Sequence, residues 1–181
     1  MICINRKNKK IQVAIKGKKI KVLDSGEDYA VAECDLDDLD GLSGNDFPEE
    51  LILEVNSEDG FGTYFFQQVC VMQENGALEL HFTFCMPNKY WEGYYGLTAY
   101  INAIIDTVEN EYKNFEVIDL NINDDCKNIT LGYTLPSEEA VIPAILIAAD
   151  ELKEVLEYAE VLLSQRKPDT QINSALFISM H

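Results

Sequence analysis

The chain has 181 residues, of which 47% are hydrophobic and 25% charged, a composition typical of a folded globular protein rather than a disordered one. Its formal net charge of −18 opposes contact with nucleic-acid phosphate and with anionic membranes, so we expect neither as a partner. Five widely spaced cysteines without a CxxC pair, and a start that lacks the apolar core of a signal peptide, indicate a reduced protein. We therefore expect it in the cytoplasm.

The charge is unevenly distributed along the chain. Residues 1–21 hold eight cations and no acid, whereas the other 160 residues hold 6 cations and all 32 acids, a net charge of −26. A surface of this sign attracts basic partners by long-range electrostatics. The sequence leaves open the alternative that the charge only keeps the protein soluble.

Residues 1–33 are predicted to form a small basic β-hairpin unit. Apolar residues alternate with polar ones at residues 11–15 and 20–22, on either side of a turn sequence at residues 16–19. A short strand at residues 29–33 completes the unit. A basic hairpin could bind RNA or a membrane, but we expect this one to pair with the acidic segment that follows it.

Residues 34–50 are predicted to be an acidic linker, and four of its carboxylates are candidates for binding a basic partner: Asp35, Asp37, Asp38 and Asp40. The run resembles a calcium loop only superficially. With Gly41 at the sixth loop position, Leu36 and Phe47 would occupy the first and twelfth positions, and neither can bind calcium. A looser divalent-cation site is the alternative for these aspartates.

Residues 51–181 carry the pattern of a larger domain, with a strand at residues 51–55 and a long hairpin centred on Asn75-Gly76. Both turn residues tolerate the positive φ that a type I′ turn requires. Pairing Glu74 with Ala77 sets the register and places the more apolar side of the hairpin toward the core. The facing pairs on that side are Val71 with Leu80, Val69 with Phe82 and Gln67 with Phe84. Two further strands are expected at residues 115–122 and 129–135.

Two amphipathic helices are expected to cover this sheet. The first follows Pro87-Asn88, with Asn88 as N-cap, and buries Leu97, Ile101, Ile104, Ile105 and Val108. The last follows Leu135-Pro136, with Ser137 as its cap and an apolar stripe between Ile145 and Leu163. The predicted fold class is α+β: an antiparallel sheet with two long helices packed on it, in the order β-β-β-α-β-β-α, plus the N-terminal hairpin unit.

This order of elements resembles the YbjN-like and type III secretion chaperone-like architecture over about residues 51–163. The features that carry the resemblance are Ile101-Asn102 midway along the first helix and the Leu135-Pro136 step into an acidic closing helix. The resemblance implies a non-enzymatic, acidic, often dimeric protein that holds another protein, and it brings no catalytic residues. The basic hairpin at residues 1–23 is not part of that pattern.

Two groups of side chains besides the aspartates are candidates for a site. Tyr90, Trp91 and Tyr95 lie at the start of the first helix, where aromatic residues can anchor a partner, although core packing is the alternative for Trp91. His81 should face Cys70, with Cys85 on the same side of the sheet. Because zinc normally takes four ligands with at least one close pair in sequence, we assign no metal, no cofactor and no catalytic residue.

Together these patterns favour a non-enzymatic acidic protein-binding module, acting as a chaperone-like holder or as an immunity or antitoxin-type inhibitor of a basic partner protein. The alternative is a small-molecule-binding domain or small enzyme, with a pocket between sheet and helices lined by Tyr94, Trp91 and His81. A homodimer formed through the last helix is a third hypothesis that the sequence leaves open.

Overall fold

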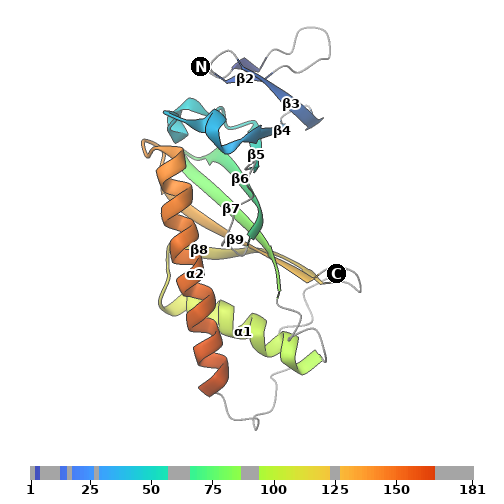
Figure 1. Ribbon diagram of the computed structural model, residues 1–181, viewed down its shortest axis with the longest axis vertical. Helices are drawn as coiled ribbons and strands as arrows, with labels where there is room; N and C mark the ends of the chain where they lie inside the picture. Colours follow the sequence, from blue (N-terminus) through green and yellow to red (C-terminus); the bar gives the residue numbers. More distant parts are fainter. Residues whose placement is uncertain are drawn as a thin grey trace.

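The computed structural model describes residues 3–4, 13–15, 18–26, 29–56, 66–86, 94–122 and 127–165. Within these residues one sheet carries two helices on one of its faces (Figure 1). The elements in chain order are β1 (Cys3–Ile4), β2 (Val13–Ile15), β3 (Lys18–Ser25), β4 (Ala30–Asp35), the 3-10 helices η1 (Leu36–Leu39) and η2 (Gly44–Asp46), β5 (Leu51–Asn56), β6 (Phe66–Glu74), β7 (Ala77–Cys85), α1 (Tyr94–Asn110), β8 (Phe115–Ile122), β9 (Lys127–Pro136) and α2 (Val141–Gln165).

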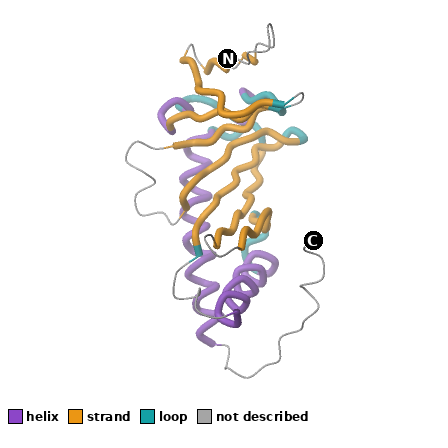
Figure 2. Tube along the Cα trace, turned by 90° about the vertical axis from the view of Figure 1, so that its right-hand side faces the viewer, coloured by secondary structure: helices purple, strands orange, loops and turns teal. Residues whose placement is uncertain are grey.

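The strands follow the order β1-β2-β3-β4-β5-β6-β7-β9-β8, and the seven from β3 to β8 make the main sheet. All neighbours are antiparallel except β4 and β5. In Figure 2, which looks onto the strands, α2 passes behind them and meets α1 at the lower end. The predicted α+β class, with two helices packed on a mostly antiparallel sheet, is confirmed. No helix in the described part of the chain is both long and apolar enough to cross a bilayer.

The parallel pair of β4 and β5 joins the predicted N-terminal unit to the sheet of β5 to β9, whose strands are all antiparallel as predicted. Parallel strands require a crossover of a dozen or more residues, and the chain from residue 36 to residue 50 supplies one. The two strands pair along their full length, from Ala30 opposite Leu51 to Asp35 opposite Asn56. The predicted boundaries at 33/34 and 50/51 therefore do not separate independent cores.

The basic hairpin at residues 1–33 is seen in its described part as β2 and β3, with Val13 opposite Ile20 and Ile15 opposite Lys18. Its second strand joins β4, and the Lys21 Nζ lies 3.2 Å from a carboxylate oxygen of Glu33. This is the pairing of basic hairpin and acidic segment expected from the sequence, although both side chains are too exposed for the ion pair to add much stability.

The hairpin of β6 and β7 has the predicted turn and almost all of the predicted register. Asn75 and Gly76 have φ of 50° and 78°, as a type I′ turn requires. Glu74 faces Ala77, and the next apolar pairs follow as predicted, down to Val69 opposite Phe82. Beyond Gln68 a register shift makes Phe66, not Gln67, the partner of Phe84. The prediction was wrong there because a bulge inserts one residue into β6 without any signal in the hydrophobic pattern.

The core lies between the sheet and the helices. β7 alternates strictly, with Leu78, Leu80, Phe82 and Phe84 at most 1% exposed. In α1, the prediction was right for Ile101, Ile104 and Val108, which are buried. Leu97 and Ile105 are only half-buried, because the buried face is centred nearer to Tyr100, Ala103 and Thr107. Thr107 is accommodated there because its hydroxyl donates to the Ala103 carbonyl at 2.7 Å.

The start of α2 is three residues later than predicted. Ser137 is buried in the turn that precedes the helix rather than at its N-cap, and α2 begins at Val141. Pro143 is then the third helical residue, where its missing N–H costs nothing because the first four N–H groups of a helix have no intrahelical partner.

Candidate protein-binding surface

The acidic turn, residues 35–40, lies beside the start of α2. Asp35, Asp37 and Asp40 are exposed and Asp38 is half-buried. Leu39, on the inner side of the turn, is fully buried and packs in the core. The segment predicted to be a linker is therefore a folded part of the domain, and it presents the four candidate aspartates from a fixed backbone.

The acidic turn creates a strongly negative environment for its neighbours. Burial first, and then the charges of Asp38, Asp35 and Glu33, raise the pKa of the Cys34 thiol to about 12. No group of three or more His, Cys, Asp and Glu side chains in the described residues is arranged to hold a metal ion.

Backbone hydrogen bonds fix the segment after the acidic turn to the entry of α2. The Val141 N–H donates to the Leu42 carbonyl at 2.9 Å, and the Asn45 N–H donates to the Ser137 carbonyl at 2.8 Å. Gly44 packs closely on the turn that precedes α2. A Cβ at Gly44 would lie 2.8 Å from the Ser137 carbonyl oxygen. The acidic turn and the first turns of α2 are consequently held as one unit.

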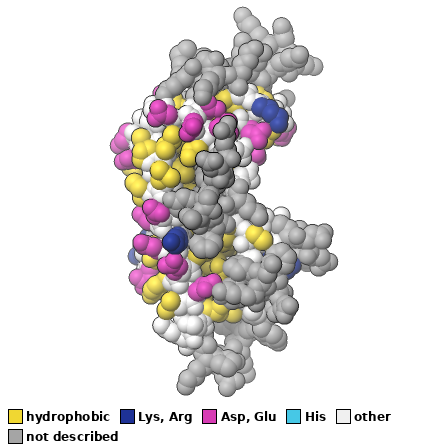
Figure 3. Space-filling model, in the orientation of Figure 1, with side chains coloured by type: hydrophobic (Ala, Val, Ile, Leu, Met, Phe, Trp, Pro, Cys, Tyr) yellow, Lys and Arg dark blue, Asp and Glu magenta, His cyan; other side chains and the backbone are white. Residues whose placement is uncertain are grey.

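The outer face of α2 is the side of that helix turned away from the sheet, and it carries four exposed apolar side chains. Their exposed fractions are 42% for Leu146, 56% for Ile147, 38% for Tyr158 and 50% for Val161. Single exposed apolar residues are normal on a protein surface, but two pairs on one helix face form a pattern. Figure 3 shows apolar side chains gathered over the upper part of α2, with carboxylates around them and below them.

Carboxylates separate the two apolar pairs on this outer face. α2 contains five acids, Asp150, Glu151, Glu154, Glu157 and Glu160, and a single cation, Lys153. Glu154 accepts a hydrogen bond from the Tyr112 hydroxyl at 3.4 Å, and the Tyr112 and Tyr158 rings meet edge to face with centroids 6.5 Å apart. These contacts hold Glu154 and Tyr158 in place beside the end of α1.

The predicted aromatic candidates fall outside the side chains that the structure describes. Tyr90 and Trp91 lie outside the described residues, and Tyr95 is described only as part of the α1 backbone. Sequence reasoning instead missed Leu146, Ile147, Tyr158 and Val161, since it followed the inner stripe of α2. The signal that could have found them is the presence of apolar residues among the acids on the polar side of an amphipathic helix.

His81 lies on the sheet face that points away from the helices, because it alternates along β7 with buried Leu80 and Phe82. It faces Cys70 as predicted. Burial lowers the pKa of His81, although the charges of Glu116 and Glu74 oppose that shift. The pocket predicted between sheet and helices cannot include His81, and Trp91 and the Tyr94 side chain lie outside the described part.

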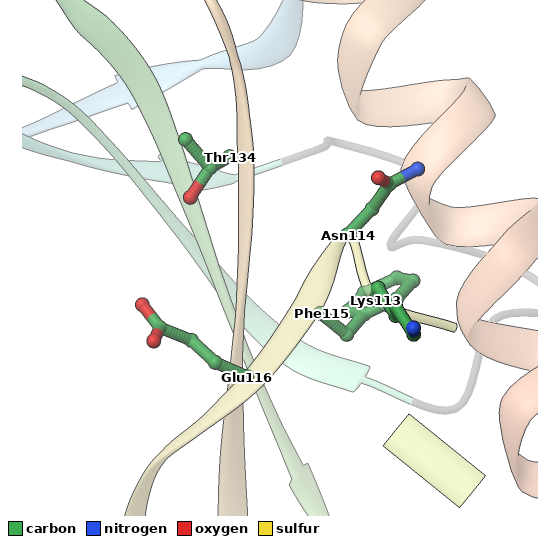
Figure 4. A pocket seen from close by; sticks show the side chains of 5 residues that line it. All are labelled: Lys113, Asn114, Phe115, Glu116 and Thr134. Carbon is green, nitrogen blue, oxygen red and sulfur yellow. The ribbon is translucent and has the colours of Figure 1, made fainter. Parts of the chain in front are cut away.

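A cavity of about 280 Å³ occurs instead at the bend between α1 and β8, lined by Lys113, Asn114, Phe115, Glu116 and Thr134. Figure 4 shows the Glu116 and Thr134 side chains on one side of β8, while those of Asn114 and Lys113 extend to the other. The polar groups therefore do not converge on one point, as those of a small-molecule site usually do.

Comparison with protein-family models, curated proteins and solved structures finds no match for this chain.

Proposed function

We propose that this chain is a non-enzymatic protein-binding module that holds a basic partner protein on its acidic surface. The observation that supports this function best is the combined surface made by the acidic turn and the outer face of α2, where exposed apolar side chains are framed by carboxylates. Protein interfaces combine apolar anchors with charged rims in this way. The net charge of −26 over residues 22–181 adds long-range attraction for a cationic protein.

Two roles fit this proposal. A chaperone-like holder would keep its client soluble or competent for transfer, whereas an immunity or antitoxin-type protein would mask the active surface of a basic toxin. Both would use carboxylates to meet lysine and arginine, and both gain association rate from charge. They differ in a measurable way, because an inhibitor abolishes the activity of its partner and a holder leaves that activity intact after release.

The test begins with capture of partners by the full chain at low salt, followed by purification of each captured protein. We expect a basic partner whose association rate falls by about tenfold or more between about 50 and 500 mM NaCl. The variant with Asp35, Asp37, Asp38 and Asp40 all changed to Asn should bind more slowly while its dissociation rate changes little. A salt-insensitive partner, or only acidic partners, would contradict the proposal.

A further inference from the structure

The two apolar pairs on the outer face of α2 have a helical spacing. Leu146 and Ile147 precede Tyr158 and Val161 by about three to four helical turns, which is roughly 17 to 22 Å along the axis. All four side chains are more than a third exposed, while the other side of the same helix is buried against the sheet and α1. A rod-shaped ligand lying along α2 would contact both pairs at once.

The charge of this face limits what that ligand can be. Asp150, Glu154 and Glu157 occupy the outer face between the two apolar pairs. A second copy of α2 packed antiparallel could match the apolar pairs, but it would also set Asp150 of each copy against Glu157 of the other, and Lys153 is the only cation that α2 supplies. Like charges across an interface are unfavourable, so charge complementarity requires cations at the centre of the partner surface.

We propose that the outer face of α2 is the docking site for a basic amphipathic helix of the partner protein. Its apolar residues, also about three to four turns apart, would pack on the two pairs, and its lysines or arginines would meet the carboxylates between them. Helices recognise one another in this way through residues that recur every three or four positions. This inference rests on the proposed function and adds the site and the shape of the bound segment.

A synthetic peptide of leucine and lysine is a suitable probe, with about 18 residues and leucines spaced to form one apolar helical face. The control peptide has the same composition in an order that destroys that face, so its charge is unchanged. Fluorescence anisotropy with the full chain should show binding of the patterned peptide at least tenfold tighter than that of the control peptide.

Two variants of the full chain locate the binding site. Replacing Ile147 and Val161 together by Ser should weaken binding of the patterned peptide by tenfold or more. The matched control replaces Leu23 and Ile122 by Ser, since these side chains are 44% and 42% exposed on β3 and β8. This control variant should bind like the wild type. All four positions are exposed, so both variants are expected to fold, and circular dichroism verifies this.

Several outcomes would overturn the inference. Equal binding of both peptides, no binding, or equal loss in both variants would exclude docking on α2. If the patterned peptide binds but only the four-Asp variant loses it, the helix docks elsewhere while the proposed acidic-surface function stands. If light scattering shows a dimer that the Ile147→Ser and Val161→Ser changes dissociate, the occupant is a second copy. A failure of the proposed function itself is seen separately, as salt-insensitive binding of the captured partner.

Discussion

At the scale of single residues, the thiols of Cys34 and Cys70 are shielded rather than activated. Burial, together with the smaller effect of nearby carboxylates, raises the pKa of the Cys34 thiol to about 12 and that of Cys70 to about 11. A reactive cysteine needs the opposite environment, because the thiolate is the nucleophile and is stabilised by positive charge. The cysteines on β4 and β6 are therefore structural.

This leads to a prediction for alkylation by iodoacetamide at pH 8. A pKa near 11 leaves so little thiolate that Cys70 should react about 100-fold more slowly in the folded chain than in the urea-unfolded chain. Cys34 should be slower still. Mass spectrometry of timed samples measures both sites. Rapid modification of either site in the folded protein would show that its surroundings are wetter or less negative than the structure indicates.

Glu79 on β7 is a carboxylate whose charge is disfavoured by its surroundings. Partial burial raises the pKa of Glu79, as do the charges of Glu116 and Glu74, whereas hydrogen bonding by the Thr134 hydroxyl lowers it. That hydroxyl lies 3.0 and 2.9 Å from the two carboxylate oxygens. The raised pKa means that the folded chain binds this proton more tightly than the unfolded chain does.

The sign of the pH effect follows from this linkage. As pH rises from the unfolded pKa of Glu79, about 4.3, through its higher folded pKa, the folded chain loses stability, and above that range the loss is constant. Glu79→Gln keeps an acceptor for Thr134 and removes the charge, so Tm at pH 7 should rise slightly, by about 2 °C or less. Thermal scans from pH 4 to 8 test this. A lower Tm for the variant at pH 7 would mean that the Thr134 contact outweighs the repulsion.

At the scale of elements, the docking of η2 on the entry of α2 depends on the absence of a side chain at Gly44. A Cβ there would lie 2.8 Å from the Ser137 carbonyl oxygen and 3.0 Å from the Leu78 Cβ, and neither group can move independently. Gly44→Ala should therefore destabilise the protein by about 1–3 kcal/mol, the usual range for overpacking.

Gly132→Ala is the matched control. The obstruction at that glycine is the tip of the exposed Ile118 side chain, at 2.8 Å, which can rotate away. Urea unfolding should show a clearly smaller loss of stability for Gly132→Ala than for Gly44→Ala. Equal losses of stability would indicate that the segment around η2 can shift as easily as an exposed side chain can rotate, and that it is not fixed to α2.

The elements differ in how well the sequence predicted them. The alternation of apolar and polar residues and the two-residue turn between them predicted β6 and β7, since both signals are local properties of the chain. The same reasoning treated residues 34–50 as an acidic linker, whereas Leu39, Leu42 and Phe47 are at most 3% exposed. Burial there depends on β6, β7 and α2, which lie up to about a hundred residues further along the chain, so no local pattern could reveal it.

The sequence identified only some of the residues of the candidate surface. The four aspartates of the acidic turn were identified from composition alone, and the structure adds their position beside α2. The exposed apolar side chains of α2 were missed, since nine other positions of that helix fill its buried face. Only the geometry separates apolar residues that face the core from those that face water.

At the scale of the whole molecule, charge is segregated. Residues 1–21 hold eight cations, of which Lys18, Lys19 and Lys21 lie on β3 in the described part of the chain, and residues 22–181 carry −26. The ion pair between Lys21 and Glu33 joins the two regions at their border. Over the rest of the structure, carboxylates outnumber cations so strongly that repulsion among them opposes folding.

Salt should therefore stabilise this protein. Raising NaCl from about 20 to about 200 mM shortens the Debye length from roughly 20 Å to 7 Å, which screens repulsion between separate carboxylates more than it weakens contacts at hydrogen-bond distance. We expect Tm at pH 7 to rise by several degrees over this range. Near the sequence pI of about 4.3 the same salt change should have little effect, because the net charge is then close to zero. Calorimetric scans at both pH values provide the measurement and its internal control. A Tm at pH 7 that falls with salt would show that attractive pairs, rather than repulsion, dominate the electrostatics of the folded chain, and would weaken the case for an acidic surface that attracts a basic partner.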